Sequence, residues 1–215
     1  MEYSDSLIVA VTGGMGCGQT TVCQFFEKFG AKAINADFVA KREIERNRNV
    51  QKELKKTFGS KIFYRNGKLN NKLLARIAFS DEIKTTRLNK IVHPQMVSSI
   101  INLIEEARES RKYPIIVIDA ALIYELTLEH MFDSVVVVTS RMQSRIERIS
   151  ARDKLSQKEI SDRIHKQLHI EEKMNWADFV IENNDSLEDL KKESRQIYQR
   201  LMRLARKKIK SGKAS

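Results

Sequence analysis

Residues 13–21 of the sequence read GGMGCGQTT and nearly match the phosphate-binding pattern G-x-x-x-x-G-K-[ST]. Glycines at this spacing let successive backbone N–H groups turn toward one anion, and a hydroxyl after the last glycine helps to hold Mg²⁺. A plain glycine-rich turn is the alternative, but the loop follows a short apolar run and precedes a helical pattern, as the motif requires. The candidate nucleotide-binding residues are Gly13, Gly14, Gly16, Cys17, Gly18, Gln19, Thr20 and Thr21, with Thr20 also a candidate Mg²⁺ ligand.

Gln19 occupies the position at which the pattern has lysine. Glutamine offers two neutral donors on a shorter side chain, whereas a hydrogen bond to a charged group contributes about 1.5–3 kcal/mol. Losing one transition-state donor can slow a reaction ~10²-fold or more. We therefore expect weaker nucleotide binding and a larger effect on turnover, which Gln19→Lys should raise. Equal turnover would mean that another cation replaces the lysine, and Arg145 is the candidate.

Carboxylates follow two of the apolar runs. Asp37 comes shortly after the second run, where it could accept the proton of an acceptor hydroxyl or cap the next helix. Asp119 ends the run IIVID, where it could hold a water of Mg²⁺ or cap a helix. Position alone does not separate these alternatives. Glu125, six residues after Asp119, is less informative by itself.

Residues 141–173 form a segment rich in arginine and lysine, including Arg145, Arg148, Arg152 and Lys154. Arginines three or four positions apart lie on one face of a helix. Such a segment could close over a phosphate site as a lid, stabilising charge and excluding water. An exposed helix with surface salt bridges is the alternative.

The apolar runs predict five strands, at residues 7–11, 31–34, 115–118, 134–138 and 179–181. A helix is expected over 20–30, with Gly30 as its stop, and strand, loop, helix and strand then form one βαβ unit. This pattern is typical of an α/β protein in which helices flank a five-stranded parallel sheet.

Residues 36–112 interrupt this pattern with helical periodicity and are expected to form an inserted helical domain. We expect helices over 47–59, 70–79 and 81–92, a break at His93-Pro94, and a new helix with Pro94 in its first turn. The core would then comprise 1–35, 113–140 and 174–208, the lid 141–173, and a basic tail 209–215.

Composition limits the class of protein and its partners. The chain has 215 residues, 41% hydrophobic and 31% charged, with a net charge of +11 and a pI near 9.6. A basic chain favours anionic partners, and no recognisable nucleic-acid module is present, so small phosphorylated molecules are expected rather than nucleic acid. Two cysteines, no apolar run long enough to span a membrane and a polar N-terminus predict a cytoplasmic protein. Cys17 lies near a helix N-terminus, which can lower the pKa of a thiol.

Together these pieces resemble the dephospho-coenzyme A kinases. The resemblance rests on an ordered set of motifs from about residue 7 to 183: VTGGMGCGQTTV, AINADFVAK, FG, GKLN, VHP, IDAALIYE, RIERISARD, Gln167 and ADFVIEN. VHP followed by D-x-x-L-x-x-E is the most specific part. The resemblance implies a P-loop core, a helical substrate domain after strand two and a small lid after strand four.

The resemblance implies that ATP, with Mg²⁺, phosphorylates the ribose 3′-hydroxyl of dephospho-coenzyme A. It assigns catalysis to Asp37 as base and to Gln19 and Arg148, and it places Arg148, Arg152 and Asn183 at the nucleotide. The implied substrate-binding residues are Asp37, Lys41, His93, Asp119, Leu122 and Glu125, and the implied Mg²⁺ ligands are Thr20 and, through water, Asp119. The oligomeric state is left open.

The chain departs from the family pattern mainly at Gln19, and also at Asn35 and Lys41. Lys41 keeps the charge of a frequent arginine but loses its bidentate geometry. Two alternatives therefore stay open: a related P-loop kinase for another nucleotide-like substrate, and a nucleotide-binding or regulatory protein of the same fold with weakened catalysis. Retention of Asp37, His93, Asp119 and the lid arginines argues against the second.

Overall fold

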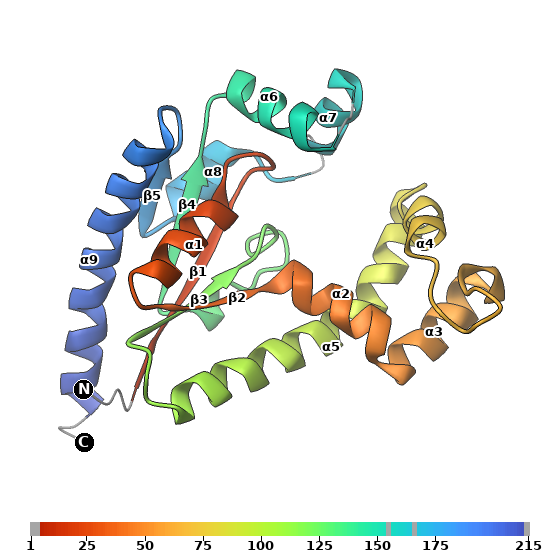
Figure 1. The fold of residues 1–215 in the computed structure, drawn as a ribbon, viewed down its shortest axis with the longest axis horizontal. Coiled ribbons are helices and arrows are strands. Elements are labelled where there is room, and N and C mark those ends of the chain that lie inside the picture. The colour runs from red at the N-terminus through yellow and green to blue at the C-terminus, as the bar shows by residue number, and fades with distance from the viewer. Residues whose placement is uncertain (1–4, 154–155, 165–166, 213–215) are drawn as a thin grey trace. The chain divides into compact units, whose positions relative to one another are not determined.

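The computed structural model describes residues 5–153, 156–164 and 167–212. A parallel sheet of five strands has the order β2-β3-β1-β4-β5. Its strands are β1 Leu7–Gly13, β2 Lys32–Asn35, β3 Ile115–Asp119, β4 Ser134–Thr139 and β5 Phe179–Glu182. The predicted α/β fold class and the five predicted strands are confirmed, and each strand begins or ends within one or two residues of its predicted range (Figure 1).

The central strands are buried on both faces because helices and loops cover each side. Alternate residues of β1 point to opposite faces. Val9 packs with residues of α1 (Gln19–Lys28) and α9 (Leu187–Gly212), whereas Ala10 packs with Ile123 and Tyr124 after β3 and with residues of α8 (Ile170–Trp176). Helices α1 and α9 thus form the layer on one face (Figure 1).

Between β4 and β5 the chain forms α6 (Met142–Asp153), α7 (Gln157–Ile164) and α8. This is the segment predicted as a lid. Lys154, one of its predicted basic residues, lies outside the described residues, as do residues 213–215 of the predicted tail. The described part of the tail continues α9 to Gly212.

Residues 36–103 form a separate compact unit, and the rest of the chain forms the other. The smaller unit contains α2 (Ala36–Arg46), α3 (Arg48–Phe58), the 3₁₀ turn η1 (Ser60–Ile62), α4 (Asn71–Ala78) and most of α5 (Glu82–Glu109). Its own core includes Leu54, Ile62, Leu74 and Val92. The helical character predicted for this region is confirmed.

The predicted break at His93-Pro94 is wrong, because α5 runs through both residues. Proline removes one backbone donor from a helix interior. The apolar spacing of four nevertheless continues across it, from Leu88 and Val92 to Met96 and Ile100, all of which are buried. The burial of this continuous stripe outweighs the lost hydrogen bond.

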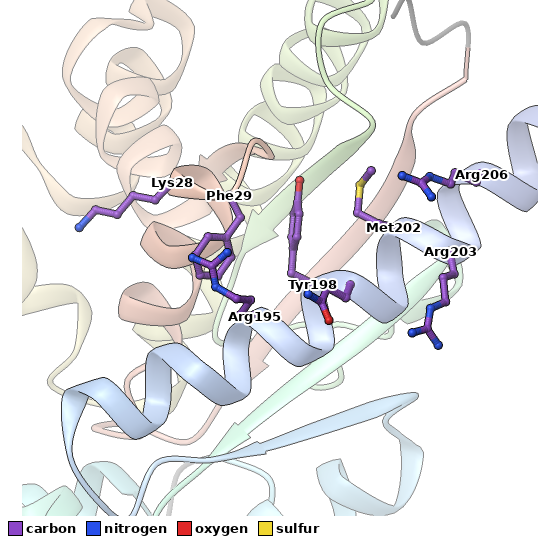
Figure 2. Close-up of a pocket in the computed structure, with 8 residues that line it drawn as sticks. Lys28, Phe29, Arg195, Tyr198, Met202, Arg203 and Arg206 are labelled. Carbon is purple, nitrogen blue, oxygen red and sulfur yellow. The ribbon is translucent and has the colours of Figure 1, made fainter.

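Basic side chains gather along α9, which has no acidic residue after Glu193. A cavity of about 530 Å³ lies beside this stretch, lined by Lys28 and Phe29 of α1 and by Arg195, Tyr198, Gln199, Met202, Arg203 and Arg206 of α9 (Figure 2). The Arg195 guanidinium lies 4.3 Å from the centre of the Phe29 ring. In the described part of the chain, no helix is both long and apolar enough to cross a membrane.

Candidate active site

The glycine-rich loop joins the carboxyl end of β1 to the first turn of α1. Gly18, directly before α1, has φ +93°, and a methyl group placed on it would collide with the side-chain amide of Asn183. The backbone amides of Gly16, Gly18 and Thr20 have no acceptor within the described part of the chain. Unused amides at the positive end of a helix favour an anion.

Asp119 lies beside this loop at the end of β3. Its buried carboxylate accepts hydrogen bonds from Gln19 Nε2 at 3.0 Å, Thr20 Oγ1 at 2.8 Å and Asn35 Nδ2 at 2.6 Å. The parallel register explains the last contact, because Asn35 stands opposite Asp119 on the neighbouring strand. Among the described elements no α-helix follows β3 before α6, so the capping alternative for Asp119 is wrong.

Thr20 and Asp119 suit Mg²⁺, because a hydroxyl and a carboxylate meet there at 2.8 Å next to the loop. Among the described residues no group of three or more histidine, cysteine, aspartate or glutamate side chains could hold a metal ion. A Mg²⁺ ion at Thr20 and Asp119 would therefore depend on phosphate oxygens and water for its remaining ligands.

Two arginines of α6 contact the loop backbone. Arg145 donates from Nε to the Met15 carbonyl oxygen at 2.9 Å. Arg148 donates to the Gly16 carbonyl, to Ser140 Oγ and to both the carbonyl and side-chain oxygens of Asn183. The exposed-helix alternative is wrong for these two residues, since Arg145 is buried and Arg148 partly so.

Arg152 behaves differently from the other two arginines. Its side chain is 66% exposed and forms a two-point hydrogen bond with its neighbour Asp153, at 2.7 and 2.8 Å. Arg152 therefore lies on an exposed helix surface and forms a surface salt bridge, as the alternative interpretation predicted. Its contact with a nucleotide stays a prediction.

Side chains from the far end of the chain also support the loop. Asn183, just after β5, donates from Nδ2 to the Cys17 carbonyl at 2.9 Å. Gln167 accepts from the Met15 amide at 3.0 Å. Gln167 belongs to the ordered motif set, but its role as a loop contact could not be read from sequence because no local pattern links it to residue 15.

Cys17 is fully buried within the loop. Burial raises the pKa of its thiol, and the nearby Arg145 guanidinium offsets only part of that shift. The position near a helix N-terminus therefore does not lower the pKa of this thiol, because loss of hydration outweighs the favourable charges. Thr21 lies in the first turn of α1, and its backbone amide donates a hydrogen bond to the Gly18 carbonyl oxygen at 3.0 Å.

Glu125 forms a salt bridge with a lysine that was not predicted from the sequence. Lys173 of α8 is fully buried, and its Nζ lies 2.6 Å from Glu125 Oε1 and 3.1 Å from the Ala121 carbonyl oxygen. The backbone amide of Leu168 donates to the same carboxylate. A lysine in an amphipathic, highly charged segment gives no sequence signal of burial. Leu122 is half-buried in the same connection, between Ala121 and Ile123.

The other predicted substrate residues belong to the 36–103 unit. Asp37 is exposed in the first turn of α2, and Lys41 is exposed one turn later in the same helix. His93 is half-buried within α5, and burial lowers its pKa. The roles of these three residues stay predictions.

Most of the chain matches known protein sequences. The sequence model of the family described as dephospho-CoA kinase matches residues 7–189. A dephospho-CoA kinase of Bacillus licheniformis is 35% identical, over 89% of this chain and 95% of its own length. Another, of Fusobacterium nucleatum, is 37% identical over 86% of this chain and 93% of its own length.

Solved structures show the same likeness. A Thermus thermophilus protein superimposes with a TM-score of 0.75 at 29% identity, over 91% of this chain and 98% of its own. A dephospho-CoA kinase from Campylobacter jejuni gives a TM-score of 0.62 at 25% identity, over 91% and 97% of the two chains. The chain belongs to the dephospho-CoA kinase family.

Proposed function

We propose that this protein transfers the γ-phosphoryl group of ATP to the ribose 3′-hydroxyl of dephospho-coenzyme A, giving coenzyme A and ADP, the last step of coenzyme A biosynthesis. Family membership over most of the chain supports the reaction. The observation that carries it is the loop between β1 and α1, whose unused amides lie beside the Thr20–Asp119 pair.

The proposed roles follow from chemistry. The loop amides bind phosphate oxygens, and Thr20 and Asp119 hold Mg²⁺, which when bound would neutralise phosphate charge. Arg148 and Asn183 keep the loop in its binding conformation, and we assign Arg152 to the nucleotide after closure of the lid. Gln19 donates a neutral hydrogen bond near the terminal phosphates.

Asp37 is proposed as the base that accepts the proton of the 3′-hydroxyl. Lys41, His93, Leu122 and Glu125 are proposed to bind dephospho-coenzyme A, through charge at Lys41 and through hydrogen bonds or packing at the others. The protein is proposed to act in the cytoplasm on these two small molecules.

A coupled assay of ADP release tests the substrate. With dephospho-coenzyme A as acceptor, release should exceed the background at least a hundredfold, and a panel of other nucleosides and nucleotides should give much less. Preference for another acceptor would favour a related kinase. Binding of ATP without transfer to any acceptor would favour the weakened nucleotide-binding protein that Gln19 alone suggests.

A further inference from the structure

Gln19 leaves the phosphate loop without the cation that such loops carry. Its side chain is neutral, and Nε2, which carries its two N–H donors, is hydrogen-bonded to Asp119 at 3.0 Å. At most one neutral N–H of Gln19 can therefore face a phosphate. In phosphoryl transfer, a positive charge at the β- and γ-phosphates stabilises the charge that develops there. A different cation beside the loop would have to supply this charge.

Arg145 lies against the loop from the side of α6. Only 4% of the residue is exposed, and Nε donates to the Met15 carbonyl oxygen at 2.9 Å. A methyl group placed on Gly14 would come within 2.7 Å of Nη2, which shows how closely the guanidinium packs on the loop backbone. The absence of a side chain at Gly14 therefore makes room for this guanidinium.

The charge of Arg145 is unpaired in the described part of the chain. It forms no salt bridge there, and its Nη1 and Nη2 atoms have no acceptor there. By contrast, the two Nη atoms of Arg148 donate to oxygens of the core, and Arg152 pairs with Asp153. A buried guanidinium with unused donors is costly unless an anion meets it.

Space for such an anion exists beside Arg145. A cavity of about 490 Å³ is bordered by Gly14, Arg145 and Gln167, and also by Arg141, Glu171 and Glu182. Arg145 thus lines a cavity at the loop, in which a polyphosphate is expected to bind.

We propose that Arg145 contacts the β- and γ-phosphates of the nucleotide and replaces the missing loop lysine. This inference rests on one part of the proposed function, the binding of a nucleoside triphosphate at this loop. It does not depend on the identity of the acceptor. It refines the sequence prediction for Gln19: a lysine there should add little while Arg145 is present, and much once Arg145 is gone.

The test measures binding of Mg·ATP and of AMP by calorimetry, together with kcat and KM. Arg145→Gln should weaken Mg·ATP binding about 10- to 100-fold and lower kcat by ~10²-fold. AMP, which lacks the β- and γ-phosphates, should bind within about threefold of the parent. Gln19→Lys added to Arg145→Gln should recover most of the loss, whereas alone it should change kcat less than about threefold.

Arg163→Gln is the matched control, since it removes an exposed arginine of α7 for which the described residues show no contact with the loop. Equal Mg·ATP affinity in the Arg145→Gln and Arg163→Gln proteins would overturn the proposal. Should Arg145→Gln fail to fold, Arg145→Met and Arg145→Lys are compared instead, and equal affinity of these two would overturn it.

The same measurements separate this inference from the proposed function. Loss of Mg·ATP affinity in Arg145→Gln, with no coenzyme A formed by the parent protein, would support Arg145 and contradict the proposed reaction. Coenzyme A formation that is unchanged by Arg145→Gln would support the proposed reaction and contradict the role of Arg145. A parent protein that binds no Mg·ATP would contradict both.

Discussion

Asp119 receives hydrogen bonds from three side chains that lie far from it in the sequence, Gln19, Thr20 and Asn35. Its place at the carboxyl end of β3 could be predicted, because an aspartate ends an apolar run there. The partners could not, because they depend on strand order: β3 stands between β1 and β2. The same holds for Arg145, whose burial depends on how α6 packs and not on its own highly charged neighbours.

The proposed role of Asp37 as the base can be tested by one substitution. If it is the base, Asp37→Asn should lower kcat by ~10²-fold or more, because the amide cannot accept the proton. Affinity for Mg·ATP should stay within about twofold, since no phosphate contact is removed. Steady-state kinetics and calorimetry on the folded variant measure both.

Glu53→Gln is a charge-matched control for Asp37→Asn, because Glu53 is an exposed carboxylate of α3 in the same unit. Its kcat should match that of the parent protein. An Asp37→Asn protein with a kcat like that of Glu53→Gln would exclude Asp37 as the base.

At the scale of elements, the strands and α1 could be predicted because short apolar runs and a glycine-rich turn are local signals. The course of α5 through Pro94 could not, since the local signal favours a break and the burial of the stripe from Leu88 to Ile100 outweighs it. Strand order was also beyond local pattern. The contacts of α6 and α8 with the core likewise depend on tertiary packing.

The buried pair of Lys173 in α8 and Glu125 after β3 gives the element-scale prediction. Lys173→Met should lower the free energy of unfolding by about 3–5 kcal/mol, because it leaves a carboxylate that is only 15% exposed without its partner. Glu125→Leu combined with Lys173→Met should cost less, since neither charge remains. Urea denaturation at neutral pH measures the difference.

Lys191→Met serves as the control for this pair. Lys191 is paired with Glu188 on the surface of α9, and loss of such an exposed pair changes stability by about 0–1 kcal/mol. If Lys173→Met is no more destabilising than Lys191→Met, the Lys173–Glu125 pair contributes no more to stability than a surface pair does.

At the scale of the whole molecule, two compact units divide the predicted site residues. The phosphate loop, Asp119, Arg145, Arg148 and Asn183 belong to the unit that contains the sheet. Asp37, Lys41 and His93 belong to the unit of residues 36–103. Helix α9 belongs to the layer that covers one face of the sheet. The cavity beside its basic stretch is lined mostly by aromatic and basic side chains (Figure 2).

Stability at high pH tests how the core of the sheet unit is built. Burial raises the pKa of Cys17 and, further, that of Cys23, and desolvation raises the pKa of Tyr124 to about 12. Groups with raised pKa values contribute stability below their unfolded pKa values and lose it as the pH rises. For the thiols the loss should begin near pH 8.5 and steepen with pH to at most about 1.4 kcal/mol per pH unit for each.

The comparison protein is Cys17→Ala combined with Cys23→Ala, which removes both thiols and leaves every other titrating group in place. Its unfolding free energy, measured with urea between pH 7 and 10, should fall less steeply with pH than that of the parent protein. Parallel pH profiles would show that the two thiols ionise as easily in the folded chain as in the unfolded one.

The proposed reaction is tested most directly by analysis of the product formed from Mg·ATP and dephospho-coenzyme A. One coenzyme A should form for each ADP, and phosphorus NMR should place the new phosphate on the ribose 3′-oxygen. A folded protein that binds Mg·ATP but forms no coenzyme A, or one that phosphorylates a different oxygen, would contradict it.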